Sequence, residues 1–405
     1  MLRRNCLPGF ISFCAIIWLA TNAALGQGSV SDFHKVLLER ATFDESDFAA
    51  LRQGQPVVRL LPGTDKREVA VCGLVSLRVT ADMFLESFRE SMTQKSDAAI
   101  LEIGRFSDTP TLADLQTLSF DERDIEDLKA CIVGDCKLKL SRMMIERLHK
   151  EVDWEASDYR VQASQLLKRM LSDYVTDYLA RGDAALIEYS DKSTAVRLAD
   201  EQRALLAASN YIGRELPDVR QHLKGFAQPE MLLVESAIVW SKIKFGLKPV
   251  ITLNHIRIYK REKGNGPRIL IAAKQIYANH YFDSSLALTA FVNFPGANPA
   301  SYLIYENRSR ADGLQGAFGK IKRGIVEGKA VNSLKTILEN SKANLNARAL
   351  DTAESAQRVE GRGWKEWKVG RVRLFLSLLL ITACFALFAL RNYRWNLGPR
   401  PSRPQ

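Results

Sequence analysis

Residues 231–310 decide the fold, and they read MLLVESAIVWSKIKFGLKPVITLNHIRIYKREKGNGPRILIAAKQIYANHYFDSSLALTAFVNFPGANPASYLIYENRSR. The stretch is rich in β-branched and aromatic residues and is interrupted by turn signals such as Gly264-Asn265-Gly266-Pro267 and Pro295-Gly296. Short connections imply that neighbouring strands run antiparallel, so the stretch predicts a β-meander. The expected strands are Leu232–Phe245, Val250–Tyr259, Arg268–Phe282, Leu286–Phe294 and Ser301–Asn307.

A long amphipathic helix is expected directly after the meander, at residues 313–346. Its apolar residues recur at helical spacing, and we expect Phe318, Ile321 and Ile325 to face the sheet. The opposite side is basic, with Lys322 as one member. That composition fits either a solvated helix face or a surface attracted to anionic lipid headgroups.

Upstream of the meander, the sequence predicts a strand at Val69–Val79 that leads into a helix with Thr80 as its N-cap. Ala98–Phe106 predicts a further strand, and most of residues 95–230 show helical periodicity. The expected fold class is therefore α+β: an antiparallel β-meander packed by a long C-terminal helix, with a helical insertion at about 95–230.

Both ends of the chain carry membrane-targeting patterns. Residues 1–26 combine Arg3 and Arg4 with a short apolar run and small residues, which is typical of a signal peptide, although an uncleaved anchor remains an alternative. Residues 374–390 form a charge-free run flanked by arginine and tryptophan, which predicts a transmembrane helix. The sequence thus predicts a single-pass protein of the cytoplasmic membrane. Its extracytoplasmic domain would span 27–346, followed by a linker at 347–373 and a basic cytoplasmic tail at 391–405.

The basic residues are unevenly distributed along the chain. The net charge of the chain is +11, and residues 1–26, 358–373 and 391–405 together account for +10 of it. Basic flanks around apolar segments indicate membrane topology, whereas a nucleic-acid-binding surface would make the remainder of the chain basic as well. We therefore expect the membrane as a partner and no nucleic acid.

Three of the six cysteines, Cys72, Cys131 and Cys136, fall in the expected extracytoplasmic domain. The short spacing of Cys131 and Cys136 around a Gly-Asp turn favours a disulfide in an oxidising compartment, with Cys72 left as an unpaired thiol. Free buried thiols and a metal half-site are the alternatives. Zinc would need further cysteine or histidine ligands close by, and the sequence offers none there, so neither a metal nor a cofactor is expected.

Four expected elements follow each other in a recognisable order. They are the strand EVAVCGLVSLRV at 68–79, the helix that starts at Thr80, the later meander and the single long helix. Over residues 57–346 this order resembles the helix-grip fold of the START/Bet v 1-like (polyketide cyclase-like) superfamily. The resemblance implies that the long helix lies across a curved sheet. The stretches AKQIYANHYFD and YLIYENRSR are also similar to bacterial exported, membrane-anchored proteins, a likeness that implies no function.

A row of polar residues lies within an otherwise apolar strand of the meander. Alternation places Lys274, Ala278 and His280 on one side of that strand and Gln275, Tyr277, Asn279 and Tyr281 on the other. Buried polar groups need partners, and Arg257, Glu306 and Arg308 on neighbouring strands are candidates. The row is either the polar spot of a ligand cavity or an outward-facing surface row with a core tyrosine. The candidate ligand-binding residues are Lys274, Tyr277, His280, Tyr281, Asp283 and Arg308.

The sequence lacks H-E-x-x-H, G-x-S-x-G, Walker-type and G-x-G-x-x-G motifs in the required contexts. The leading hypothesis is a binding module that holds an apolar or lipid-like molecule between the sheet and the long helix. An envelope interaction or structural protein is the second hypothesis. A cyclase-like or hydrolase-like enzyme that uses His280, Asp283 or Tyr281 as acid or base is the third.

Overall fold

The computed structural model describes residues 43–95, 98–209, 231–246, 248–262, 268–293, 301–314 and 319–359 of the 405-residue chain. The predicted signal peptide, transmembrane segment 374–390 and basic tail lie outside these residues. Within the described part of the chain, no helix combines the length and the apolar character needed to cross a membrane.

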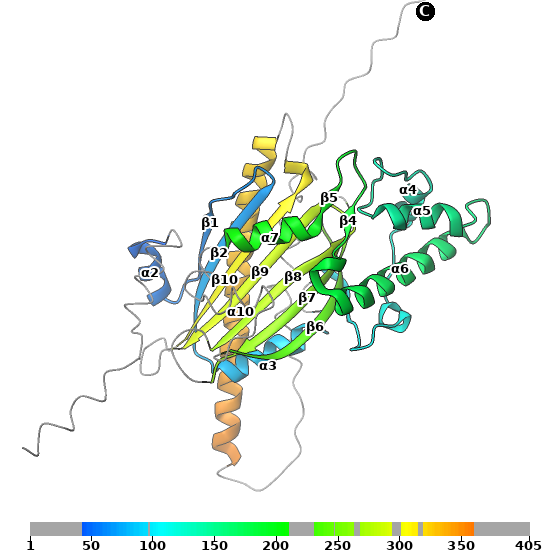
Figure 1. Ribbon diagram of the computed structural model, residues 1–405. Helices are drawn as coiled ribbons and strands as arrows, with labels where there is room; N and C mark the ends of the chain where they lie inside the picture. The colour runs from blue at the N-terminus through cyan, green and yellow to red at the C-terminus, as the bar shows by residue number, and fades with distance from the viewer. Residues whose placement is uncertain are drawn as a thin grey trace, which may run out of the picture.

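An eight-stranded antiparallel sheet forms the centre of the molecule (Figure 1). The strand order across the sheet is β1-β2-β10-β9-β8-β7-β6-β3, so the five strands of the meander lie side by side and the strands from the N-terminal part flank them. The strands are β1 (Val57–Leu61), β2 (Glu68–Leu77), β3 (Ile100–Arg105), β6 (Leu232–Ile243), β7 (Val250–Lys260), β8 (Ile269–Ala278), β9 (Phe282–Asn293) and β10 (Ser301–Ala311).

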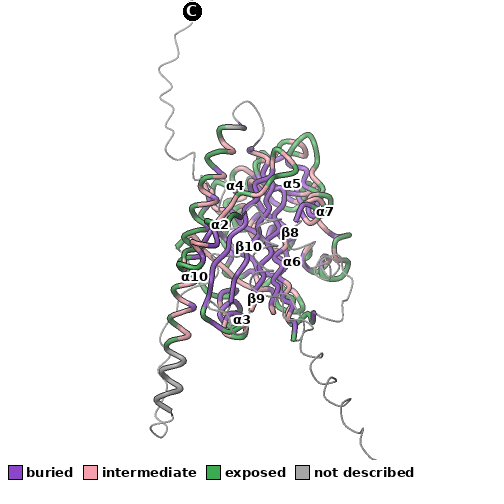
Figure 2. Tube along the Cα trace, turned by 90° about the vertical axis from the view of Figure 1, so that its left-hand side faces the viewer, coloured by how far each residue is buried: buried purple, intermediate pink, exposed green. Residues whose placement is uncertain are grey.

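Helices cover both faces of this sheet. One face packs against α3 and the long α10, and the other face is covered by α2, α7 and the α4–α6 group, as Figure 1 shows. Three apolar clusters hold these layers together, and the strands at their centre are buried along almost their whole length (Figure 2). The helices are α2 (Glu45–Arg52), α3 (Ala81–Ser91), α4 (Glu122–Lys129), α5 (Arg142–Glu151), α6 (Tyr159–Arg181), α7 (Leu198–Ala208) and α10 (Gly319–Val359).

The α+β class and the antiparallel meander are confirmed, and so is the N-cap, because the backbone N–H of Met83 donates to Thr80 Oγ1 at 3.2 Å. The helical insertion covers a shorter part of the chain than the expected residues 95–230. β3, inside the predicted insertion, pairs with β6 and forms the edge of the main sheet. The described helical part therefore starts only after β3, and it also contains a two-stranded hairpin of β4 (Glu188–Tyr189) and β5 (Val196–Arg197).

The turn between β8 and β9 differs from the prediction. The sequence suggested one strand up to Phe282 and the next from Leu286, but β8 ends at Ala278 and β9 begins at Phe282. Tyr281 adopts a left-handed backbone with φ 61°, which ends the strand without a glycine. The side chain of Asn279 replaces a lost ladder contact, since its Oδ1 accepts the backbone N–H of Ile251 at 2.8 Å.

The orientation of the long helix was also predicted wrongly at its start. Ile321 and Ile325 are 65% and 42% exposed, whereas Leu334 and Leu338 are fully buried against the sheet. At about 100° per residue, Ile325 lies about 140° around the helix from Leu338 and so points away from the sheet. Phe318 lies outside the described residues.

The helix α10 also continues beyond its predicted end. It runs to Val359, into the stretch that was expected to be a linker. Residues 347–359 contain neither glycine nor proline and are rich in alanine and other good helix formers, so nothing in that segment stops the helix.

Cys131 and Cys136 form the disulfide that the sequence predicted. The loop they close is joined to the segment after β4, because the backbone N–H groups of Gly134 and Cys136 donate to the carbonyls of Ser190 and Asp191. Cys72 is a buried free thiol on β2.

Candidate functional site

The six residues predicted to bind a ligand do not gather in one place. Lys274 forms an ion pair with Asp183, just after α6. His280 lies at the opposite end of β8, where its Nε2 is 2.8 Å from Asp124 Oδ2 on α4. The predicted alternation failed here because β8 carries a bulge where it pairs with β7 and because the strand ends at Ala278.

The two tyrosines of the predicted site belong to the packed interior. Tyr277 is 2% exposed and lies 6.3 Å from Tyr189, measured between ring centroids, within the apolar cluster formed with α4–α6. Tyr281 packs on Phe245 with a centroid distance of 5.4 Å. Neither side chain lines either of the two pockets described below.

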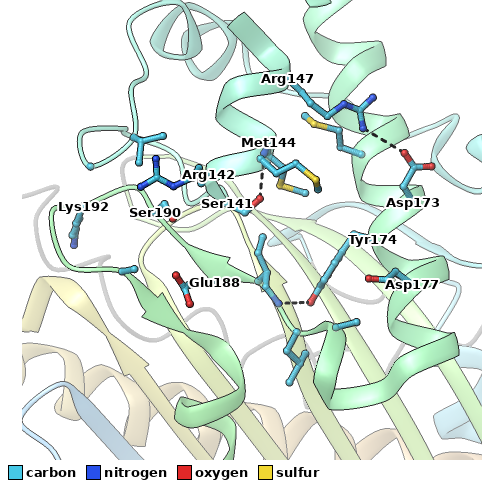
Figure 3. Close-up of a pocket in the computed structure, with 18 of the residues that line it drawn as sticks. Ser141, Arg142, Met144, Arg147, Asp173, Tyr174, Asp177, Glu188, Ser190 and Lys192 are labelled. Carbon is cyan, nitrogen blue, oxygen red and sulfur yellow. Dashed lines mark hydrogen bonds and ion pairs between the residues drawn. The ribbon is translucent and has the colours of Figure 1, made fainter. Parts of the chain in front are cut away.

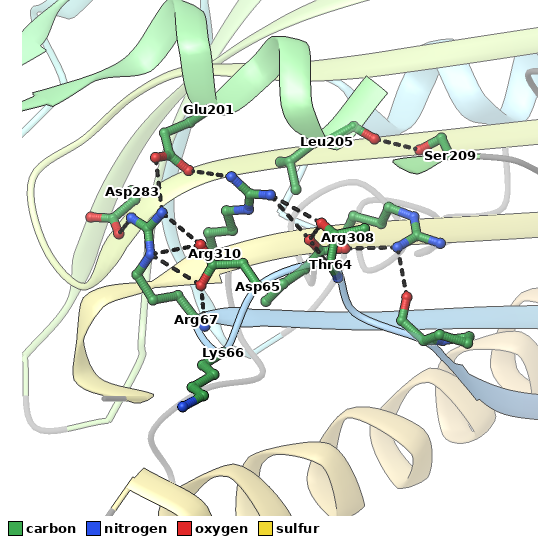
Figure 4. Close-up of polar contacts among 12 residues, drawn as sticks. Thr64, Asp65, Lys66, Arg67, Glu201, Leu205, Ser209, Asp283, Arg308 and Arg310 are labelled. Atoms are coloured by element: carbon green, nitrogen blue, oxygen red, sulfur yellow. Dashed lines mark hydrogen bonds and ion pairs between the residues drawn. The ribbon is translucent and has the colours of Figure 1, made fainter. Parts of the chain in front are cut away.

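Arg308 belongs to a buried ion network that Figure 4 shows. Its Nη1 is 2.7 Å from Glu68 Oε1, and its Nε donates to Glu306 Oε1 at 2.9 Å. Burial raises the pKa of Glu306. Arg310, two residues further along β10, reaches Glu201 on α7 at 2.8 Å, so the network ties α7 to the sheet.

Asp283 lies at the other end of the same polar layer. Its carboxylate accepts hydrogen bonds from Arg67 Nη1 and Lys139 Nζ, each at 2.9 Å. Lys139 is 3% exposed and is also near Asp312 (3.4 Å) and Asp191 (3.8 Å). Burial alone would lower the pKa of Lys139, but these aspartates hold it above its ordinary value. The carboxylate of Asp283 is therefore already paired with cations of the protein itself.

Two pockets are found on the side of the sheet opposite α10, and α10 lines neither of them. On the α10 side, apolar side chains of α3, α10 and the sheet form one packed cluster; for example, Phe84 of α3 stacks on Phe291 of β9 at 5.2 Å. At these contacts, core side chains fill the space between the sheet and the long helix.

The first pocket, the α5–α6 pocket, has a volume of about 1140 Å³ and lies beside the disulfide loop (Figure 3). Its charged groups neutralise one another: Arg147 is 3.6 Å from Asp173, and Arg181 pairs with Asp177. Tyr174 at its base donates to the carbonyl of Ile276 at 2.6 Å. The polar groups of this pocket are therefore largely satisfied within the protein.

The second pocket, which we call the α7 groove, has a volume of about 730 Å³ and lies between α7, the end of α6 and strands β7–β9. Its apolar wall is formed by leucines and alanines, among them Leu186, Leu206, Ala272 and Leu286. Its basic side chains are Arg197, Arg203, Arg257 and Lys274, and its acidic ones are Asp183 and Glu188.

His255 lines the α7 groove and is the central member of a polar row. His255 of β7 is 5% exposed, and its Nδ1 lies 2.8 Å from the hydroxyl of Tyr178 on α6. Its Nε2 lies 2.8 Å from Ser236 Oγ on β6. Burial, together with the charges of Arg257 and Lys274, lowers the pKa of His255 to about 3, so the ring is neutral at physiological pH.

The Ser236–His255 contact resembles a nucleophile and its base, but the surroundings oppose that chemistry. A general base must carry a proton during the reaction, and the imidazolium needs a nearby negative charge. The neighbours of His255 are instead a phenol and two cations. The row therefore does not favour proton abstraction, and both ring nitrogens of His255 already have partners within the protein.

Arg257 is the group in this groove with unused binding capacity. It is partly buried, and its contacts are His255 Nε2 at 3.4 Å and the phenol of Tyr259. No acidic side chain of the described residues forms an ion pair with it, in contrast to Arg197 and Arg203 on the rim.

Sequence reasoning identified Lys274 and named Arg257 as a neighbour, but it missed Tyr178, Ser236 and His255. One signal was present in the sequence. His255 and Arg257 alternate within the apolar strand VITLNHIRIYK, so both point to the same face of the sheet.

Among the described residues, no group of three or more histidine, cysteine, aspartate or glutamate side chains is arranged to hold a metal ion. The candidate site is thus a groove with an apolar wall, a neutral polar row and one arginine without an acidic partner. Comparison of the chain with protein-family models, with curated proteins and with solved structures gives no match, so a function has to be argued from the chemistry of this groove.

Proposed function

We propose that this chain is a membrane-anchored extracytoplasmic binding module that holds a small apolar or lipid-like molecule in the α7 groove. The observation that carries the proposal is the groove itself. It has about 730 Å³ of space, a leucine- and alanine-rich wall and a few converging polar side chains. Small-molecule sites typically have volumes of about 300–1,000 Å³ and this division between apolar walls and polar anchors.

The direct test is native mass spectrometry of the purified full-length protein, followed by extraction and identification of any retained molecule. A variant pair on α7 ties the result to the groove. Ala199 lines the groove, whereas Ala204, which is also partly buried on α7, does not. Ala199→Trp should abolish the bound mass, and Ala204→Trp should keep it. Retention of the molecule by Ala199→Trp would place it elsewhere and defeat the proposal.

The membrane part of the proposal rests on the sequence of residues 1–26 and 374–390. It predicts that protease added outside the cytoplasmic membrane digests residues 27–370 and spares the tail at 391–405. A reporter-fusion map that places the domain in the cytoplasm would contradict it.

We also propose a relationship to the helix-grip fold. It is supported by the order β2, α3, β3, β6–β10, α10, with β2 beside β10 and β3 beside β6. The proposed ligand position differs from the one expected from that resemblance, because the α7 groove lies on the face of the sheet opposite α10.

An envelope interaction protein remains the second candidate, and one observation favours it. Leu232, Leu233 and Val234 at the start of β6 are between 40% and 54% exposed, although they are consecutive apolar residues. A photo-reactive amino acid placed at 233 in intact cells should then form a specific adduct with another protein. The enzyme hypothesis has no such support, since His280, Tyr281 and Asp283 line neither pocket.

A further inference from the structure

We propose that the molecule bound in the α7 groove is a carboxylate with an aliphatic chain, and that Arg257 binds its head group with Lys274 beside it. This inference rests on the proposed function and specifies the class of ligand. It makes Arg257 the specificity-determining residue of the groove.

The first argument is the unpaired state of Arg257. A guanidinium is always charged, and a partly buried one is normally paired with a carboxylate or phosphate. The described residues provide no acid for Arg257, which contacts only the neutral groups of His255 and Tyr259. Its charge is thus available to an anion that enters the groove, and a carboxylate matches the planar fork of the guanidinium with two parallel hydrogen bonds.

The second argument is the position of Lys274. In the pairing of β7 with β8, His255 lies opposite Lys274 and Arg257 lies opposite Ala272. Arg257 and Lys274 are therefore diagonal neighbours on one face, a relation in which the two residues lie about 7–8 Å apart. An anionic head group between them would contact both cations.

The third argument concerns charge balance. Lys274 has Asp183 as its own counter-charge, whereas Arg257 has no acidic partner among the described residues. The two cations therefore lack roughly one negative charge, which a monovalent head group would supply. A dianionic phosphate monoester would bring more negative charge than these cations can balance.

The fourth argument is the wall that an alkyl chain would contact. Leu186, Leu206 and Leu286 line the groove around the two cations. On the neighbouring strand, Leu233 lies opposite Tyr259 and is 51% exposed, so apolar surface continues past the arginine. A cation between apolar side chains is suited to an amphipathic acid.

The experiment compares three probes with the same eight-carbon chain: octanoate, 1-octanol and octyl phosphate. Each is titrated at pH 7.5 into the full-length protein in phospholipid nanodiscs by isothermal titration calorimetry, with empty nanodiscs as the blank. Wild type should bind octanoate at least about tenfold more tightly than 1-octanol, and more tightly than octyl phosphate.

Three variants assign the preference to Arg257. Arg257→Gln should lose most of the preference for octanoate over 1-octanol, with only the part that Lys274 supplies left. Arg257→Lys should retain part of the preference, because it keeps the charge and loses the fork. Arg105→Gln is the matched control, since it removes one charge from a sheet arginine outside the groove, whose partner Glu235 keeps Arg89.

The outcomes separate the two proposals. Equal affinity of wild type for octanoate and 1-octanol would overturn the carboxylate assignment and leave the apolar groove standing. Tighter binding of octyl phosphate would overturn it in favour of a phosphate head group. No binding of any probe would defeat both the inference and the proposed function. Loss of the preference in Arg105→Gln would show a long-range charge effect and overturn the role of Arg257.

Discussion

Gly73 of β2 and Leu338 of α10 pack so closely that no larger side chain fits between them. A Cβ atom added at Gly73 would lie 2.7 Å from Leu338 Cδ1 and 3.0 Å from Leu334 Cδ2. Both leucines are fully buried. The backbone of β2 therefore packs directly against the long helix at this point.

The first prediction tests that packing. Gly73→Ala should destabilise the protein by about 1–3 kcal/mol through overpacking. Gly328 on α10 has open space around it, so Gly328→Ala should instead stabilise by about 0.5–1 kcal/mol through helix propensity. The free energy of unfolding from urea titrations checks both values. A neutral Gly73→Ala would mean that a void does exist beneath the helix.

The long helix also shows where sequence reasoning succeeded and where it failed. The strands of the meander could be located because β-rich runs alternate with turn residues. The prediction placed the wrong face of the helix start against the sheet, because Ile321 and Ile325 form as good an apolar stripe as the buried residues do. Contacts with residues far away in sequence, Gly73 among them, decide which stripe is buried. The turn at Tyr281 was missed because its left-handed backbone is not marked by glycine.

The second prediction concerns the buried cation Lys139. Lys139→Met should cost about 3–5 kcal/mol, because it leaves the buried carboxylate of Asp283 with one cation fewer and removes the charge facing Asp191 and Asp312. Lys192 also pairs with Asp312, but its side chain is 52% exposed. Lys192→Met should therefore cost no more than about 1 kcal/mol. Similar losses of unfolding free energy in the two variants would show that Asp283 is not part of a structural network.

The third prediction concerns the cysteines. Cys72 is fully buried, and burial raises the pKa of its thiol, so the reactive thiolate is scarce in the folded protein. Iodoacetamide should leave Cys72 unmodified in the native protein and modify it in guanidinium. Cys131 and Cys136 should react only after reduction. Peptide mapping by mass spectrometry distinguishes the three sites, and rapid native labelling of Cys72 would disprove its burial.

The candidate site was harder to predict than the sheet for a physical reason. Its lining residue His255 of β7 is contacted by Tyr178 from α6 and Ser236 from β6. Ser236 reaches His255 through the pairing of β6 with β7, but Tyr178 reaches it only because the helical insertion folds back over the sheet, and no local pattern encodes that contact. The predicted residues His280 and Asp283 stood out in the sequence as polar groups in an apolar region, but His280 contacts Asp124 and Asp283 pairs with Lys139, and these contacts hold helices and loops in place.

The last prediction concerns the pH dependence of stability through His255. Its pKa is about 3 in the folded protein, against an ordinary value of 6.5, so the unfolded chain binds more protons between these two pH values. Stability must therefore fall as pH decreases from 6.5 towards 3, by up to about 1.4 kcal/mol per pH unit from this group. Above pH 6.5 the contribution is constant, because the ring is neutral in both states.

His255→Gln keeps hydrogen-bonding groups at this position but does not titrate. The difference in unfolding free energy between wild type and His255→Gln, measured by urea titration at half-unit steps from pH 7.5 to 4, should be flat above pH 6.5. Below that pH it should shift steadily in favour of the variant, because only wild type loses stability by protonating a buried imidazole next to Arg257 and Lys274. Parallel stability curves over the whole range would show that His255 accepts a proton in the folded protein as easily as in the unfolded one.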